Sequence, residues 1–113
     1  MTTSYSNFFV PTVLTTSAAT LYTVPATPTN SLLRGGRMRF TNTAAGPITV
    51  TAYAVPSGGF AAVGNAFISA KSIAAGDYLD ADVPIMPAGA FIQALASSAT
   101  SITAHMLSGS VFS

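Results

Sequence analysis

Charge is the scarcest property of this sequence. Its 113 residues include four Lys or Arg and three Asp, and Glu, Cys and Trp are absent. A soluble domain normally carries a charge at about a quarter of its positions, so Thr, Ser, Asn and backbone groups must form most of the surface here. The absence of cysteine excludes a disulfide framework. Few titratable groups remain that could converge in an active site, and we therefore expect no catalytic residues and no cofactor.

The apolar content is high, at 50% of the residues, but its pattern is not that of a membrane protein. The charge-free stretches Met1 to Leu33 and Phe40 to Ala70 are interrupted by Pro and Gly, and neither contains about 18 consecutive apolar residues. No Lys or Arg precedes the first apolar residues, so a secretory signal is not expected either. The net charge of +1 has no dense basic run behind it. Nucleic acid and anionic membranes are therefore not expected as partners.

Apolar residues recur with a period of two. From Ile48 to Val55, Ile48, Val50, Ala52 and Ala54 share one face and Thr49, Thr51, Tyr53 and Val55 the other, which predicts a strand with one face in a core. Similar runs are Leu21 to Val24, Arg37 to Thr41, Ala66 to Ile73, Tyr78 to Ile85, Phe91 to Ala96 and Ile102 to Phe112. Turn signals separate them at 44–47, 56–59, 75–77 and 87–89.

About seven or eight short antiparallel strands at this spacing predict an all-β domain, a β-sandwich or jelly roll, over residues 20–113. The Ala-rich stretch Gly59 to Ala70 would also permit one helical turn.

The first 19 residues differ in composition from the rest of the chain. Met1 to Asn7 is polar apart from Tyr5, and Phe8, Phe9 and Val10 follow. This segment is either the first strand or an extended N-terminal arm that contacts a neighbouring subunit. In the second case Tyr5, Phe8 and Phe9 are the expected anchors.

The charged residues are candidates for an interface. Arg37 and Arg39 share a strand face and could meet Asp80 and Asp82, within the chain or across a subunit boundary. The three acids could in principle bind Ca²⁺, but Asp77 belongs to a turn and no further ligand follows in calcium-loop spacing, so no metal is expected. The basic cluster that Arg37 and Arg39 form with Arg34 has no aromatic platform beside it, which argues against a nucleic-acid site.

The remaining polar candidate, His105, is the single imidazole of the chain. No Gly-x-Ser-x-Gly turn is present to support a Ser-His-Asp arrangement. The aromatic residues are distributed over all the expected strands. That distribution is typical of core and interface packing and not of a carbohydrate-stacking site.

An ordered series of short phrases resembles small virion proteins of tailed bacteriophages, over about residues 20 to 108. The phrases are Leu21-Tyr22-Thr23-Val24-Pro25-Ala26, Arg39-Phe40-Thr41-Asn42-Thr43, Ile48-Thr49-Val50-Thr51, Tyr53-Ala54-Val55-Pro56-Ser57-Gly58-Gly59, Ala74-Ala75-Gly76-Asp77 and Pro87-Ala88-Gly89-Ala90-Phe91-Ile92. The resemblance implies a compact β-sandwich that decorates or cements a capsid, or forms part of a tail or fibre. It implies no catalytic residues.

Composition and resemblance together predict a capsid decoration or cement protein on the outer surface of the virion. Its expected partners are the major capsid protein and other copies of itself, in a dimer or trimer. The alternatives are a tail, head-tail adaptor or fibre component, or a receptor- or carbohydrate-binding module. The last would need exposed aromatic residues gathered at one end of the domain.

Overall fold

The computed structural model of the chain describes residues 3–4, 11–26 and 31–112. Strands dominate these residues, with one 3-10 turn, η1 (Val63–Asn65). The strands are β1 (Thr3–Ser4), β2 (Thr12–Val13), β3 (Ala19–Thr23), β4 (Leu32–Asn42), β5 (Ile48–Val55), β6 (Ala66–Ile73), β7 (Tyr78–Asp82), β8 (Met86–Pro87), β9 (Phe91–Ala96) and β10 (Ile102–Phe112).

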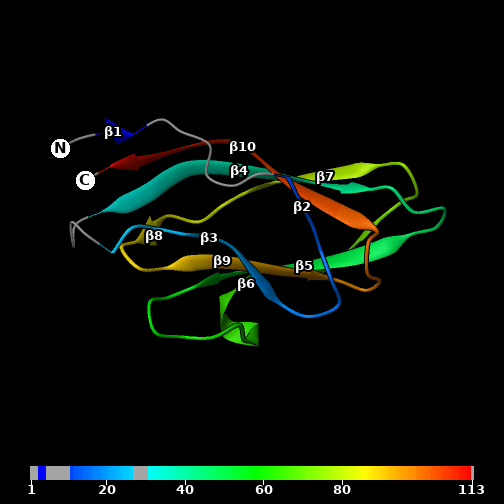
Figure 1. Cartoon of the computed structure of the whole chain (residues 1–113), viewed down its shortest axis with the longest axis horizontal. Coiled ribbons are helices and arrows are strands. Elements are labelled where there is room, and N and C mark those ends of the chain that lie inside the picture. Colours follow the sequence, from blue (N-terminus) through cyan, green and yellow to red (C-terminus); the bar gives the residue numbers. More distant parts are fainter. Residues whose placement is uncertain (1–2, 5–10, 27–30, 113) are drawn as a thin grey trace.

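The strands form two antiparallel sheets that pack face to face (Figure 1). In the first sheet, β1 and β2 both pair with one edge of β10, β10 pairs with β4, and β7 and β8 pair with the far edge of β4. The second sheet has the order β3-β9-β5-β6. The expected β-sandwich is confirmed.

The strand order is that of a jelly roll. If β1 with β2, and β7 with β8, each count as one position, the described strands occupy the orders 1-8-3-6 and 2-7-4-5 in the two sheets. Neighbouring strands within each sheet are therefore mostly distant in sequence, as in two interlocked Greek keys.

The core lies between the sheets and follows the alternation in the sequence. Met38 and Phe40 on β4 are fully buried, while Arg37, which directly precedes Met38, is exposed. Val55 departs from the expected pattern. The alternation predicts it on the outer face of β5, but its side chain is fully buried. The turn after β5 folds over it: a Cβ atom on Gly59 would lie 3.4 Å from Val55 Cγ1.

Two other segments differ from the sequence-based expectation. β4 begins at Leu32, five residues before the predicted strand, and passes through Gly35, whose φ of +69° suits glycine. The run predicted from Tyr78 to Ile85 forms a strand, β7, only as far as Asp82, and the short β8 begins beyond it at Met86, because Pro84 lacks the N–H group that a continuous ladder requires. The stretch from Gly59 to Ala70 agrees with its expectation, because it contains one helical turn, η1, and most of β6, which has its predicted bounds.

The described parts of the N-terminal segment lie on the chain's own first sheet. Thr3 is paired with Phe112, and Thr12 with Ala104, both on β10. The anchors Tyr5, Phe8 and Phe9 lie outside the described residues, so their contact with a neighbouring subunit stays a prediction.

Candidate functional site

The charged residues converge on the strand pair β4–β7. Arg39 and Asp80 are directly opposite each other in the antiparallel ladder, so their side chains leave the sheet on the same face. Arg39 Nε donates to Asp80 Oδ1 at 2.7 Å, and Nη2 donates to Oδ2 at 2.9 Å. This bidentate geometry is the strongest form of an arginine–carboxylate pair.

A second, looser pair lies beside it. Arg37 is opposite Asp82, with Nε 3.9 Å from Asp82 Oδ1, and Arg37 Nη2 lies 4.0 Å from Asp80 Oδ2. The Asp82 side chain is 92% exposed, against 17% for Asp80. Solvent screens such an exposed pair, which therefore contributes little to stability. The predicted meeting of the two arginines with the two aspartates thus occurs within one chain.

The electrostatics of the tight pair follow from its geometry. The hydrogen bonds from Arg39 lower the pKa of Asp80, and partial burial opposes this shift without cancelling it. The same bonds raise the pKa of Arg39. The ring of Tyr78 lies 4.2 Å from the guanidinium carbon of Arg39, in cation–π position, and His105 is opposite Arg39 on the other neighbouring strand.

The remaining acid, Asp77, stands apart from this cluster. Its Oδ1 accepts a hydrogen bond from the backbone N–H of Tyr78 at 2.8 Å, which fixes the turn before β7. Within residues 3–4, 11–26 and 31–112, no group of three or more His, Cys, Asp or Glu could hold a metal ion.

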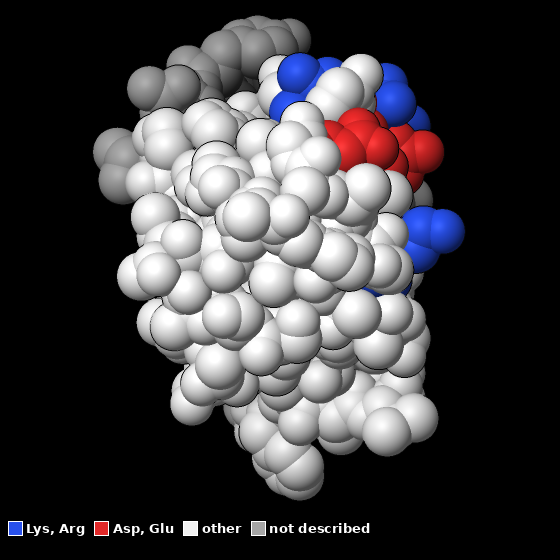
Figure 2. Space-filling model, turned by 90° about the vertical axis from the view of Figure 1, so that its right-hand side faces the viewer, with Lys and Arg blue, Asp and Glu red and all other residues white. Residues whose placement is uncertain are grey.

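The charges are unevenly distributed over the molecule. Arg34, Arg37 and Arg39 belong to β4, Asp80 and Asp82 to β7, and Lys71 to β6 in the other sheet. Figure 2 shows the charged side chains gathered along one margin of the view, while the remaining visible surface is uncharged. The pairs that Arg37 and Arg39 form with Asp80 and Asp82 can stiffen β4 against β7.

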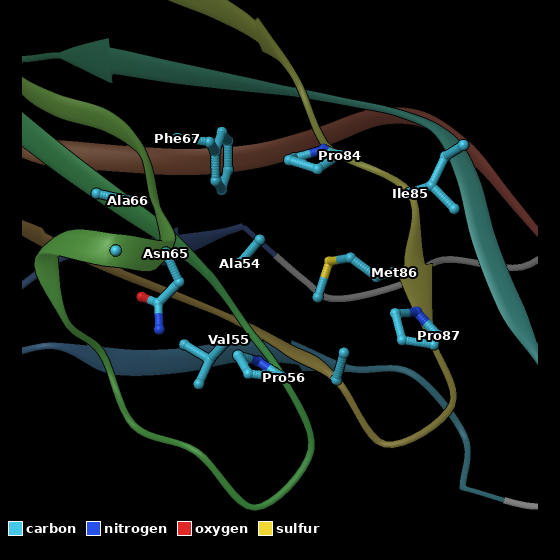
Figure 3. A pocket seen from close by; sticks show the side chains of 12 residues that line it. Ala54, Val55, Pro56, Asn65, Ala66, Phe67, Pro84, Ile85, Met86 and Pro87 are labelled. Atoms are coloured by element: carbon cyan, nitrogen blue, oxygen red, sulfur yellow. The ribbon is translucent and has the colours of Figure 1, made fainter.

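A second candidate site is an apolar groove of about 340 Å³. One wall comes from β5, η1 and β6, and the other from the segment 84–87 that contains β8 (Figure 3). Its lining residues are uncharged: Ala54, Val55, Pro56, Gly64, Asn65, Ala66, Phe67, Pro84, Ile85, Met86, Pro87 and Ala90.

Large apolar side chains in the segments that line or adjoin this groove are open to solvent. Ile85 on one wall is 64% exposed, and Val63 in η1, beside the other wall, is 95% exposed. Phe60, in the loop that leads to η1, is 78% exposed. We call these three residues the apolar rim. The rim and the groove were not predicted from the sequence, although the prolines spaced as Pro84-x-x-Pro87 were a signal for an irregular segment at the edge of a sheet.

The loop that presents Phe60 and Val63 is held in place by Asn65. The Asn65 side chain donates from Nδ2 to the Phe60 carbonyl at 3.0 Å and accepts at Oδ1 from the Ala62 N–H at 3.1 Å. Its backbone N–H also donates to the Ala62 carbonyl at 3.0 Å. Two of the three rim residues, Phe60 and Val63, therefore lie on a turn that hydrogen bonds hold in place.

Comparison with known proteins gives no relative that could name this site. No protein-family model, no curated protein and no solved structure matches the chain. Among the residues described above, no helix is long and apolar enough to cross a membrane.

Proposed function

We propose that this protein is a non-catalytic structural component of a bacteriophage virion, a decoration or cement protein on the outer surface of the capsid. The observation that carries the proposal is the apolar rim, in which Phe60 and Val63 lie on a hydrogen-bonded turn and Ile85 lies on the other wall of an uncharged groove. An exposed apolar patch of this kind is a usual mark of a protein–protein contact.

The jelly-roll order supports the same proposal. Eight-stranded jelly rolls are a recurrent architecture of viral capsid proteins, and also of lectins. Fold alone does not define function. The combination of this fold with paired charges and an apolar rim favours a surface that binds other proteins.

The proposed mechanism is passive. The protein binds the assembled shell, with the major capsid protein and other copies of itself as partners, and bridges neighbouring capsid subunits. Each contact is modest, but a ligand that binds only the assembled state stabilises that state by mass action. Many copies on one particle add their effects through multivalency.

The location of the chain in an electron-microscopy map of the intact particle tests this proposal. We expect density for the jelly roll on the outer capsid surface, across the boundaries between major capsid subunits. Density confined to the tail, the head-tail adaptor or a fibre would contradict the cement function and support the alternative location.

A further inference from the structure

The outer face of the first sheet carries opposite charges on two neighbouring strands. Arg37 and Arg39 alternate with buried residues of β4, so both side chains leave the sheet on the face away from the core. Asp82 lies opposite Arg37 in the ladder and Asp80 opposite Arg39, so the acids of β7 leave the sheet on the same face. We call the two arginines the basic row and the two aspartates the acidic row. Neighbouring strands lie about 4.8 Å apart, so the two rows are adjacent.

The pair Arg37–Asp82 within these rows is open to solvent. Arg37 Nε lies 3.9 Å from Asp82 Oδ1, which is longer than a hydrogen bond. Both side chains are exposed, and that of Asp82 almost completely. The guanidinium N–H groups and the carboxylate oxygens of this pair therefore retain the capacity to bind an opposite charge on a surface that covers the face.

The register of β4 and β7 makes this face complementary to itself. A two-fold axis that lies in the plane of contact and runs along the strands, midway between β4 and β7, places the basic row of one copy over the acidic row of the other. Arg37 and Asp82 occupy the same level of the ladder, and so do Arg39 and Asp80. Each arginine therefore faces the aspartate of the other copy at its own level. A two-fold axis across the strands would instead place like charges over each other.

An exposed tyrosine extends the same face by one level. Tyr78 is opposite Thr41 in the ladder, and it is 54% exposed. The guanidinium carbon of Arg39 lies 4.2 Å from the centre of its ring, which supports the ring from one side. The two-fold axis along the strands places Tyr78 of each copy over Thr41 of the other. Tyrosine is enriched in protein–protein interfaces, because it adds a large apolar area with a polar end.

We propose that this face joins two copies of the chain, with Arg37 of each copy paired to Asp82 of the other. Charge complementarity identifies a second copy as the partner, because the charges on this one face match their own two-fold image in both sign and level. The pairs are few, so the contact belongs to the small and weak class of interfaces. The inference rests on the proposed function only in taking other copies as partners, and it is measured on the isolated protein.

Sedimentation equilibrium of the full chain at low ionic strength tests the contact. The wild type is expected to dimerise, with a dissociation constant that rises as salt is added. Arg37→Asp and Asp82→Arg should each raise this constant about ten-fold or more, because like charges then face each other across the contact. The matched control is Lys71→Asp on β6, in the other sheet, which changes the net charge as Arg37→Asp does and should leave the constant unchanged. All three side chains are exposed, so the variants should stay folded, which circular dichroism checks.

An equimolar mixture of Arg37→Asp and Asp82→Arg provides a second, independent reading. One variant then carries acids at both positions of the open pair and the other carries arginines at both, so the mixed pair is complementary at every position. The mixture should associate more tightly than either variant alone. A mixture of Lys71→Asp with Asp82→Arg has the same net charges and should associate less tightly, because arginines then face each other at one position.

A monomeric wild type, an equal effect of Lys71→Asp, or a mixture that associates no more tightly than its components would overturn the proposal. A monomeric wild type whose Arg37→Asp variant no longer binds particles would also overturn it, in favour of a contact between this face and another virion protein. That last result would leave the proposed function standing.

Discussion

At the scale of single residues, Asn42 at the end of β4 is a polar side chain with several hydrogen bonds, and its role was not predicted from the sequence. Asn42 is fully buried and its Nδ2 donates to the carbonyls of Ile73 at 2.8 Å and Gly46 at 2.9 Å. Its Oδ1 accepts from the N–H of Ala44 at 2.8 Å. One side chain thus joins the turn after β4 to the end of β6.

Replacement of Asn42 by Ala should lower the free energy of unfolding by about 3 kcal/mol, because buried backbone groups lose their partners. Urea denaturation at neutral pH measures this loss. The matched control is Asn65→Ala, whose hydrogen bonds are exposed and should contribute clearly less. Equal losses for both variants would show that Asn42 does not join the two elements.

The pair Arg39–Asp80 should make stability depend on pH. Arg39 lowers the pKa of Asp80 in the folded state relative to the unfolded value of about 3.9. The stabilisation is therefore complete above the unfolded pKa and is lost as the pH falls through the lower, folded pKa. Arg39→Met should destabilise the protein at pH 7 and lose its effect in strong acid, as measured by urea denaturation between pH 7 and pH 2.

Arg37→Met is the comparison for that experiment, because the Arg37 contacts are longer, at 3.9 and 4.0 Å. Its effect at neutral pH should be smaller than that of Arg39→Met. A difference between wild type and Arg39→Met that stays constant down to pH 2 would show that the arginine acts through packing and not through charge.

At the scale of elements, two turns at the same end of the sandwich pack tightly together. Gly89, in the turn between β8 and β9, has a φ of +80°, and a Cβ atom built on it would lie 2.6 Å from Ser57 Oγ. Ser57 belongs to the turn after β5. Glycine is therefore required at position 89 by both its backbone conformation and its neighbour.

Gly89→Ala should reduce the free energy of unfolding by about 1 to 3 kcal/mol, as expected for a strained left-handed backbone. Adding Ser57→Gly should recover the steric part of the loss and leave the backbone part. Gly46→Ala is the control, because a Cβ there meets no atom within 4 Å. Thermal denaturation of the wild type, Gly89→Ala, the double variant and Gly46→Ala separates the steric part of the loss from the backbone part. A double variant no more stable than Gly89→Ala would rule out the contact with Ser57.

Much of this element structure could be predicted from the sequence, because side-chain alternation and turn glycines act locally. β6, β9 and β10 begin and end at the predicted residues. The alternation also placed Arg37 and Arg39 off the core face. Side-chain alternation alone could not identify β7 as the neighbour of β4, since the order of strands in a sheet depends on contacts between distant segments. For the same reason the groove was missed, because η1 and the segment 84–87 meet only in the folded chain.

At the scale of the whole molecule, charge and apolar surface are separated. The arginine–aspartate pairs lie on β4 and β7, and the apolar rim lies at the groove between η1 and Ile85. The pairs satisfy charged groups within the chain, whereas the rim leaves apolar surface in contact with water in the monomer. The exposed apolar side chains therefore favour the proposed contact with other proteins.

The proposal that this protein stabilises assembled shells by binding them is tested most directly by the heat resistance of particles depleted of the protein. Depleted particles should remain assembled but release their genome at a lower temperature than intact ones. Adding back the purified chain, without any cofactor, should restore the intact value. Depleted particles that resist heat and osmotic shock as well as intact ones, yet fail to adsorb to cells, would contradict the claim.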